Sequence, residues 1–77
     1  MGRVDNFPES FDAHIYQGSR TVTPGFYRRA KQGLSNDGVM YSTRGSINGR
    51  TGTFEIGVRP STSGRTELIM HRSFRPD

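Results

Sequence analysis

The sequence predicts an α+β domain in which short N-terminal helices pack on a small, twisted antiparallel β-sheet. Two patterns predict this class. Helix signals are confined to the stretch before Gly38, whereas a period of two in apolar residues governs most of the chain after it. The 77 residues suffice for one domain, and since only 30% of them are apolar or aromatic, the core must be small.

The first helix is expected within residues 6–17. Pro8 has no backbone N–H to donate, which suits the first turn of a helix. Phe11, His14 and Ile15 then follow at helical spacing, so that they lie on one side. An extended segment over the same residues is the alternative interpretation.

A second helix is expected over residues 24–33. Thr23 can cap its start, Pro24 suits its first position, and Gly33 can end it. This helix would have an apolar side made of Phe26, Tyr27 and Ala30. Its basic side would consist of Arg28, Arg29 and Lys31.

Three strands are expected after residue 38, over residues 39–44, 53–59 and 67–74. The connections between them are rich in Gly and Ser, where Gly supplies a positive φ angle and Ser caps the turn locally. In the middle strand one face carries Phe54, Ile56 and Val58. In the last strand one face carries Leu68, Met70 and Phe74, and the other carries Glu67, Ile69, His71 and Ser73.

Matching the apolar faces of the last two strands leaves few possible registers, because a slip by one residue would bury the wrong set of side chains. We expect the register that aligns the two apolar sets. Its cross-strand pairs are Val58 with Leu68, Ile56 with Met70, Glu55 with His71, and Arg59 with Glu67. Side chains in such pairs are close enough to interact.

The strand over residues 39–44 fits two registers. In one register Met40 belongs to the core, and in the other Val39 and Tyr41 do. We favour the first, because it leaves Arg44 at the end of the strand. Five side chains then share the face away from the core: Tyr41, Thr43, Glu55, Arg59 and His71.

Positive charge is concentrated in residues 20–75, which hold ten Lys or Arg against three acidic residues. Residues 1–19 hold one Arg and three acidic residues, and the net charge of the chain is +4. Ten of the eleven basic residues are arginine, whose planar fork binds phosphate oxygens two at a time. The sequence therefore predicts a phosphate-bearing partner, with nucleic acid first and an acidic protein as the alternative.

Composition argues against several other functions. The chain has no cysteine, two histidines and few carboxylates, so we expect no disulfide, no metal site and no cofactor. No apolar stretch approaches the roughly 18 residues of a membrane span, so we expect no membrane association. No glycine-rich phosphate loop precedes a helix.

The remaining chemistry fits RNA cleavage without a metal, which needs a base, an acid and cations around the phosphate. His71 and His14 are candidates for proton transfer, since the reference pKa of imidazole is about 6.5. Glu55 is expected to orient His71 or to act as the base. Tyr41 and Thr43 are expected to donate hydrogen bonds or stack on a base. The expected phosphate ligands are Arg28, Arg44, Arg59 and Arg72.

These residues also have structural interpretations. A strand histidine often packs rather than reacts, and His14 can simply pack in its helix. Tyr41 can belong to the core, and Glu55 and Glu67 can form ordinary cross-strand ion pairs. A non-catalytic module that binds RNA or DNA is therefore the alternative to a nuclease.

A histidine in a short N-terminal segment precedes a basic helix, and the hairpin GTFEIGVRPSTSGRTELIMHRSFRPD closes the chain with HRSFRP near its end. This layout resembles the C-terminal nuclease domains of bacterial contact-dependent growth-inhibition and other polymorphic toxins. Many of those are similar to the barnase–EndoU–colicin–RelE group of ribonucleases. By motif type, only His14, His71 and the arginine-rich sheet face carry over.

The resemblance implies a metal-independent toxin ribonuclease, often specific for tRNA, and cleavage by the 2′-hydroxyl group without a metal leaves a 2′,3′-cyclic phosphate. It also implies a cognate immunity protein, a host factor that presents tRNA, and delivery as part of a larger secreted or cell-surface toxin into the cytoplasm of a target cell. We therefore expect residues 1–77 to be a single small nuclease domain from a longer protein.

Overall fold

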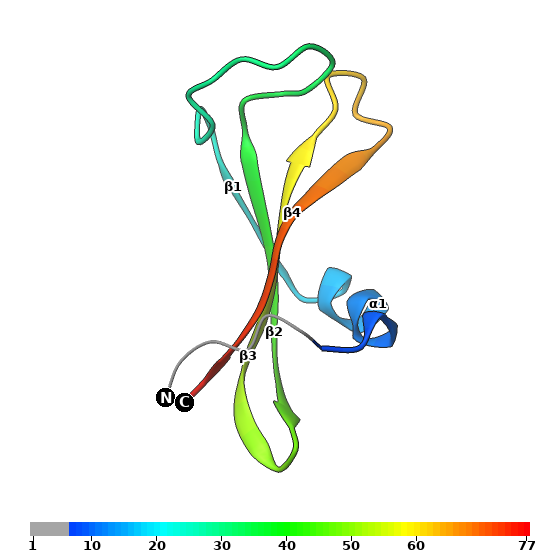
Figure 1. Ribbon diagram of the computed structural model, residues 1–77, viewed down its shortest axis with the longest axis vertical. Coiled ribbons are helices and arrows are strands. Elements are labelled where there is room, and N and C mark those ends of the chain that lie inside the picture. The colour runs from blue at the N-terminus through cyan, green and yellow to red at the C-terminus, as the bar shows by residue number, and fades with distance from the viewer. Residues whose placement is uncertain (1–6) are drawn as a thin grey trace.

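The computed structural model describes residues 7–77, which form a strongly twisted antiparallel sheet and one short helical segment (Figure 1). The 3-10 turn η1 (Glu9–Phe11) leads directly into helix α1 (Asp12–Tyr16). The strands β1 (Ser19–Thr23), β2 (Gly38–Ile47), β3 (Arg50–Pro60) and β4 (Glu67–Pro76) follow, and they lie side by side in chain order. The α+β class predicted from the sequence is confirmed.

Turn chemistry explains the two hairpins that build most of the sheet. Asn48 and Gly49 connect β2 to β3 with φ angles of 51° and 78°, the left-handed pair that a two-residue type I′ turn requires. Between β3 and β4, Gly64 has a φ angle of 75°, and the Ser61 hydroxyl accepts a hydrogen bond from the Thr66 N–H at 3.2 Å. The expected use of Gly and Ser in these connections is confirmed.

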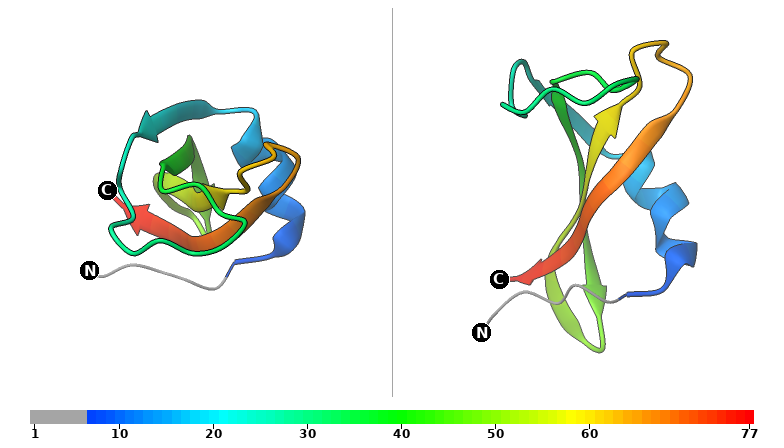
Figure 2. Two further views of the ribbon diagram at one scale, coloured as in Figure 1. Left: turned by 90° about the horizontal axis from the view of Figure 1, so that it is seen from above. Right: turned by 45° about the horizontal axis from the view of Figure 1, so that its top comes forward.

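The core lies between the sheet and residues 7–16, which we call the N-terminal segment. This segment covers one side of the sheet (Figure 2). The helix expected within residues 6–17 is confirmed as η1 and α1, residue 6 lying outside the described residues, and Ile15 of α1 is fully buried. The rings of Phe7 and Phe11 meet the Phe54 ring edge-on, with centroids 5.2 and 5.3 Å away. We call this side of the sheet the core face; its buried strand residues are Val39, Phe54, Ile56, Val58 and Phe74.

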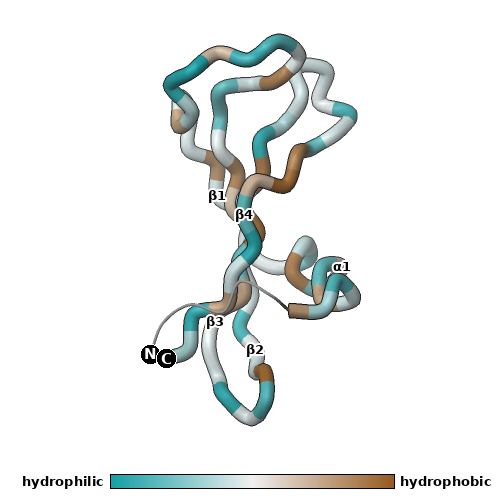
Figure 3. Tube along the Cα trace, viewed as in Figure 1, coloured by the Kyte–Doolittle hydropathy of each residue, from teal (hydrophilic) through white to brown (hydrophobic). Residues whose placement is uncertain are grey.

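The helix predicted over residues 24–33 is wrong. The β-branched run before it forms β1, which ends at Thr23, and residues 24–37 form a largely hydrophilic loop that arches over one end of the sheet (Figures 1 and 3). Gly25, which would lie in the first turn of that helix, has a φ angle of 66°, which a right-handed helix does not allow. Pro24 therefore starts a turn, and the signal that suits a helix start serves a turn here.

The predicted register between β3 and β4 is also wrong. Val58 pairs with Ile69 and Gly57 pairs with His71, so that Met70 is an extra residue on β4. This is a β-bulge, which shifts the pairing by one residue at that point. The predicted partners of Ile56, Glu55 and Arg59 are replaced by Arg72, Ser73 and Leu68, respectively.

In β2 the preferred register, with Met40 in the core, is wrong. Val39 pairs with Val58 and Tyr41 pairs with Ile56, and directly paired residues of an antiparallel sheet point to the same side. Val39 and Tyr41 therefore belong to the core face, as in the alternative register. This arrangement brings two large side chains to the core where the preferred one would have brought a single methionine.

Gly52 of β3 occupies a place that has no room for a side chain. A Cβ atom there would overlap the Arg75 carbonyl oxygen and would lie 2.7 Å from the Phe74 ring. We expect Gly52→Ala to lower the free energy of unfolding by about 1–3 kcal/mol, measured by urea denaturation. Gly57→Ala is the control and should cost less, because its Cβ would meet His71 at an ordinary 3.5 Å. Equal losses for the two variants would contradict this packing at Gly52.

Candidate functional site

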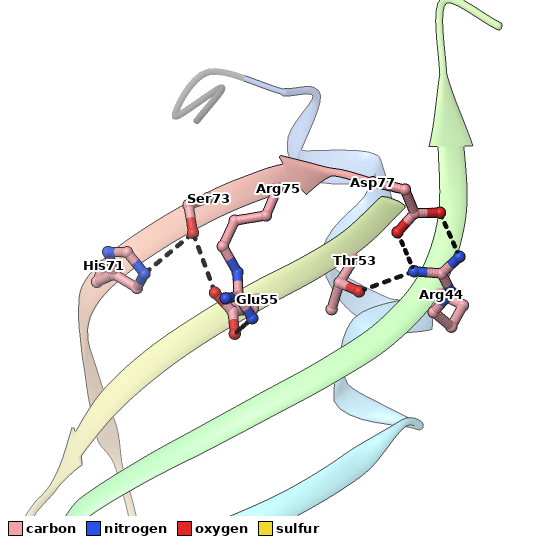
Figure 4. A network of polar contacts seen from close by, with 7 residues as sticks. All are labelled: Arg44, Thr53, Glu55, His71, Ser73, Arg75 and Asp77. Atoms are coloured by element: carbon pink, nitrogen blue, oxygen red, sulfur yellow. Dashed lines mark hydrogen bonds and ion pairs between the residues drawn. The ribbon is translucent and has the colours of Figure 1, made fainter. Parts of the chain in front are cut away.

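The side of the sheet away from the core, which we call the polar face, carries side chains that can bind an anion or transfer a proton. The pairing of β2, β3 and β4 assigns each residue to a side, because paired residues share one. The polar face carries Ser42 and Arg44 from β2, Thr53 and Glu55 from β3, and His71, Ser73 and Arg75 from β4. Figure 4 shows most of these residues together with Asp77, which directly follows β4.

Four of these residues form a continuous hydrogen-bonded chain (Figure 4). Nε2 of His71 lies 3.1 Å from Oγ of Ser73, and the Ser73 hydroxyl donates to Oε1 of Glu55 at 3.5 Å. Nη2 of Arg75 donates to Oε2 of Glu55 at 2.8 Å. The Ser73 hydroxyl thus lies within hydrogen-bond distance of both groups, and the tautomer of the imidazole sets which atom donates between His71 and Ser73. The chain therefore links an imidazole, a carboxylate and a guanidinium.

The four hydrogen-bonded residues differ in how deeply they are buried. Ser73 is fully buried, and the Glu55 side chain is only 12% exposed, whereas the Arg75 side chain is 56% exposed. His71 is half-buried. The carboxylate is thus fixed from both sides by hydrogen bonds, while the guanidinium remains accessible to an anion from solution.

A second cluster lies one row along the polar face. Nη1 and Nη2 of Arg44 each donate to one carboxylate oxygen of Asp77 at 2.6 Å, and Nη1 also donates to the Thr53 hydroxyl at 3.3 Å. These hydrogen bonds lower the pKa of Asp77 below its ordinary value and raise the pKa of Arg44 above its own. The two exposed arginines of the polar face, Arg44 and Arg75, are therefore both held by carboxylates.

The sequence interpretation missed three members of these clusters, namely Ser73, Arg75 and Asp77. A signal was present, because residues 71, 73 and 75 alternate on one side of a strand. The expected strand ended at residue 74, however, which excluded Arg75 and Asp77 from consideration. Ser73 was assigned to the same side as His71 without a role.

Three of the expected catalytic residues lie away from the polar face. His14 is exposed on α1, which packs against the core face. Tyr41 and Thr43 pair with core-face residues of β3. The Tyr41 hydroxyl accepts a hydrogen bond from Nε of Arg20 at 3.2 Å and donates to Glu67 at 3.0 Å. Only His71 and Glu55 of the expected catalytic set are brought together.

Arg59 is a structural residue rather than an exposed cation. It is 5% exposed, and its guanidinium donates to the carbonyl oxygens of Ser35 at 2.7 Å and Arg29 at 3.0 Å. It also donates to Oδ1 of Asn36 at 2.9 Å and lies 4.7 Å from the centre of the Tyr27 ring. Arg59 thus fastens the loop of residues 24–37 to the sheet.

Arg72 is likewise committed to packing. It lies on the core face, where its guanidinium stacks 4.2 Å from the centre of the Phe7 ring and pairs with Asp12. It also donates to the carbonyl oxygen of Phe7 at 3.3 Å. Arg72 therefore holds the N-terminal segment against β4. Of the four expected phosphate ligands, only Arg44 is exposed on the polar face, because Arg59 alternates onto that side of β3 but is buried.

Arg28 belongs to a separate basic surface at one end of the sheet. The loops over residues 24–37 and 61–66 meet there (Figure 1), joined by hydrogen bonds from the Ser35 N–H to the Pro60 oxygen at 2.8 Å and from the Thr62 N–H to the Gly33 oxygen at 3.0 Å. The exposed basic residues of these loops are Arg28, Arg29, Lys31 and Arg65. This group, the basic end, provides long-range attraction for a polyanion.

Comparisons with known proteins do not assign this chain to a family. No protein-family model matches the chain, and no curated protein or solved structure matches it. Within residues 7–77, no three His, Asp or Glu side chains are placed to hold a metal ion together. In the same part of the chain no helix has the length and apolar character needed to cross a membrane.

Replacing Arg59 should affect stability and leave nucleic-acid affinity unchanged. We expect Arg59→Met to lower the free energy of unfolding by about 2–3 kcal/mol, because the carbonyl groups of Ser35 and Arg29 lose a charged donor whose side chain is buried. Urea denaturation measures the loss, and hydrogen exchange should show faster exchange in residues 24–37. Arg28→Met, at an exposed position, is the control with little expected effect on stability. A stable Arg59→Met variant that binds RNA more weakly would contradict the structural role.

The pKa shift of Asp77 predicts a pH dependence with a definite sign. Because its pKa is lowered in the folded protein, the Arg44–Asp77 pair contributes stability above the ordinary aspartate range. That contribution is lost as the pH falls through the lowered value. A carbon-detected NMR titration should show the Asp77 pKa below its ordinary value of 3.8. In Arg44→Gln the pKa should return towards that value, and no change would contradict the assigned cause.

Proposed function

We propose that this chain is a metal-independent endoribonuclease domain that cleaves RNA by attack of the 2′-hydroxyl group and leaves a 2′,3′-cyclic phosphate. One observation carries the proposal: an imidazole, a carboxylate and an accessible guanidinium share one hydrogen-bonded chain on the polar face. These are the three kinds of group that cleavage requires, namely an acid, a base and a cation for the phosphate.

Glu55 suits the role of the base, and His71 suits the role of the acid. The Glu55 carboxylate takes the proton of the 2′-hydroxyl group as its oxygen attacks phosphorus. The bond from phosphorus to the 5′-oxygen then breaks, and His71 in its protonated form gives that oxygen a proton. Ser73 is a positioning residue, because its hydroxyl lies between the two groups and holds them in a fixed relation.

Arg75 suits the stabilisation of the transition state. Its guanidinium is exposed and is paired with Glu55 through a single hydrogen bond, so it can turn towards a phosphate group that approaches the same carboxylate. This movement places positive charge next to the non-bridging oxygens, where negative charge accumulates during attack. It also leaves the carboxylate free to accept a proton.

The basic end supports nucleic acid as the substrate class. Four exposed basic residues there face solution around the single acidic residue of these loops, Asp37. Such a concentration of charge raises the rate of encounter with a polyanion. Within this proposal a tRNA substrate, an acidic immunity protein, a host factor that presents tRNA and delivery from a larger toxin are hypotheses that rest on the resemblance alone.

A non-catalytic RNA- or DNA-binding module is the second candidate. The observation that favours it is the length of the Ser73–Glu55 hydrogen bond, 3.5 Å, together with the ordinary cross-strand character of the Arg75–Glu55 pair. Such a module would shift RNA in a gel without shortening it. Analysis of both the shift and the fragment ends in one incubation separates the two candidates.

The purified protein should cut tRNA in the presence of EDTA, and the new 3′ ends should be cyclic phosphates. We expect His71→Ala and Glu55→Gln each to lower the cleavage rate by about 10²–10⁴-fold, since each removes a proton-transfer group. Far-UV circular dichroism and the urea midpoint should remain close to those of the unmodified chain. His14→Ala is the control and should cleave normally. Full activity in His71→Ala, or loss of all activity in EDTA, would contradict the proposal.

A further inference from the structure

We infer that Arg44 and Thr53 form a phosphate subsite beside the cleavage site, and that the Asp77 carboxylate occupies this subsite in the free protein. The RNA substrate of this inference rests on the proposed function. The geometry of the subsite does not, because it follows from the contacts of three residues on the polar face (Figure 4).

The shape of the Arg44–Asp77 contact is that of a phosphate complex. Each terminal nitrogen of the guanidinium donates to a different carboxylate oxygen at 2.6 Å, in the parallel fork with which arginine also binds two phosphate oxygens. The Thr53 hydroxyl, 3.3 Å from the guanidinium, stands beside the fork and can donate to a third oxygen. The two carboxylate oxygens of Asp77 thus occupy the positions in which two phosphate oxygens would bind.

The Asp77 carboxylate is held in a way that permits exchange. The side chains of Arg44 and Asp77 are 60% and 56% exposed, so water and salt screen their attraction. Arg72, by contrast, has a side-chain exposure of 19% in its pair with Asp12 and cannot be reached in the same way. A phosphodiester that is anchored at a neighbouring site therefore competes with Asp77 at a high local concentration.

The position of Arg44 relative to the proposed cleavage site fits a neighbouring phosphate of the same strand. Arg44, Thr53 and Arg75 lie in one row across β2, β3 and β4, so the Cα atoms of the two arginines are roughly 10 Å apart, two strand spacings. A cleft lined by Ser19, Ser42, Arg44 and Thr53, among others, extends from Arg44 towards β1. An RNA strand that passes Arg44 on the side away from Arg75 can continue along this cleft.

The test measures binding without cleavage. The probe is a 2′-O-methyl tetranucleotide with a fluorescent label, in which the attacking oxygen is blocked, and fluorescence anisotropy gives its affinity. We expect Asp77→Asn to raise affinity roughly threefold at low salt, the scale of an exposed ion pair. Arg44→Gln should lower affinity and reduce the slope of log affinity against log salt by about 0.7, one phosphate contact on a single strand.

Two controls decide between a local subsite and a general effect of charge. Glu9→Gln makes the same change in net charge at an exposed position of η1, and should leave the affinity nearly unchanged. The gain from Asp77→Asn should vanish in the Arg44→Gln background. Equal gains in Asp77→Asn and Glu9→Gln, no gain in Asp77→Asn, or a gain that persists without Arg44 would each overturn the inference. A chain that shows this pattern and cuts no RNA would retain the subsite and lose the proposed nuclease activity.

Discussion

The β-bulge at Met70 is the constraint on which the candidate site depends. On one side of it Ile69 pairs with Val58 on the core face, and on the other side His71 pairs with Gly57 on the polar face. If β4 continued in the register of Ile69, His71 would lie opposite Ile56 and point into the core. In that register Ser73 and Arg75 would also point into the core, and Phe74 would point to the polar face. One extra residue therefore separates a buried histidine from a candidate catalytic one.

Arginine has two distinct roles in this small protein, and strand parity together with local partners decides between them. Arg59 and Arg72 are largely withdrawn from solution, where they contact backbone carbonyls, a carboxylate and aromatic rings, and Nε of Arg72 is buried without a hydrogen-bond partner. Arg44 and Arg75 lie on the polar face and keep exposed side chains. The high arginine content thus supports a core of modest size as well as a surface for phosphate, so composition alone overstates the number of phosphate ligands.

The sequence predicted the class of fold because its strongest signals are local. Alternation in β3 and the Asn48–Gly49 turn each act within a few residues. The bulge could not be predicted, since the consecutive apolar residues 68–70 satisfy either parity of β4. The false helix arose because Pro24 and Gly25 suit a turn as well as a helix start. His71 and Glu55 were found from their residue types, whereas Ser73, Arg75 and Asp77 gain meaning only from cross-strand contacts that no linear pattern contains.

Each exposed arginine of the polar face is paired with a carboxylate, and this pairing determines how the face can bind a polyanion. Arg75 faces Glu55 and Arg44 faces Asp77, so the face offers an incoming phosphate no unpaired guanidinium in the Arg44 and Arg75 clusters. Attraction over distance must then come from the exposed basic residues of the basic end. Binding at the face itself is an exchange of carboxylate for phosphate. At Arg75 that exchange also frees the Glu55 carboxylate, so the group expected to take the proton becomes available when the phosphate arrives.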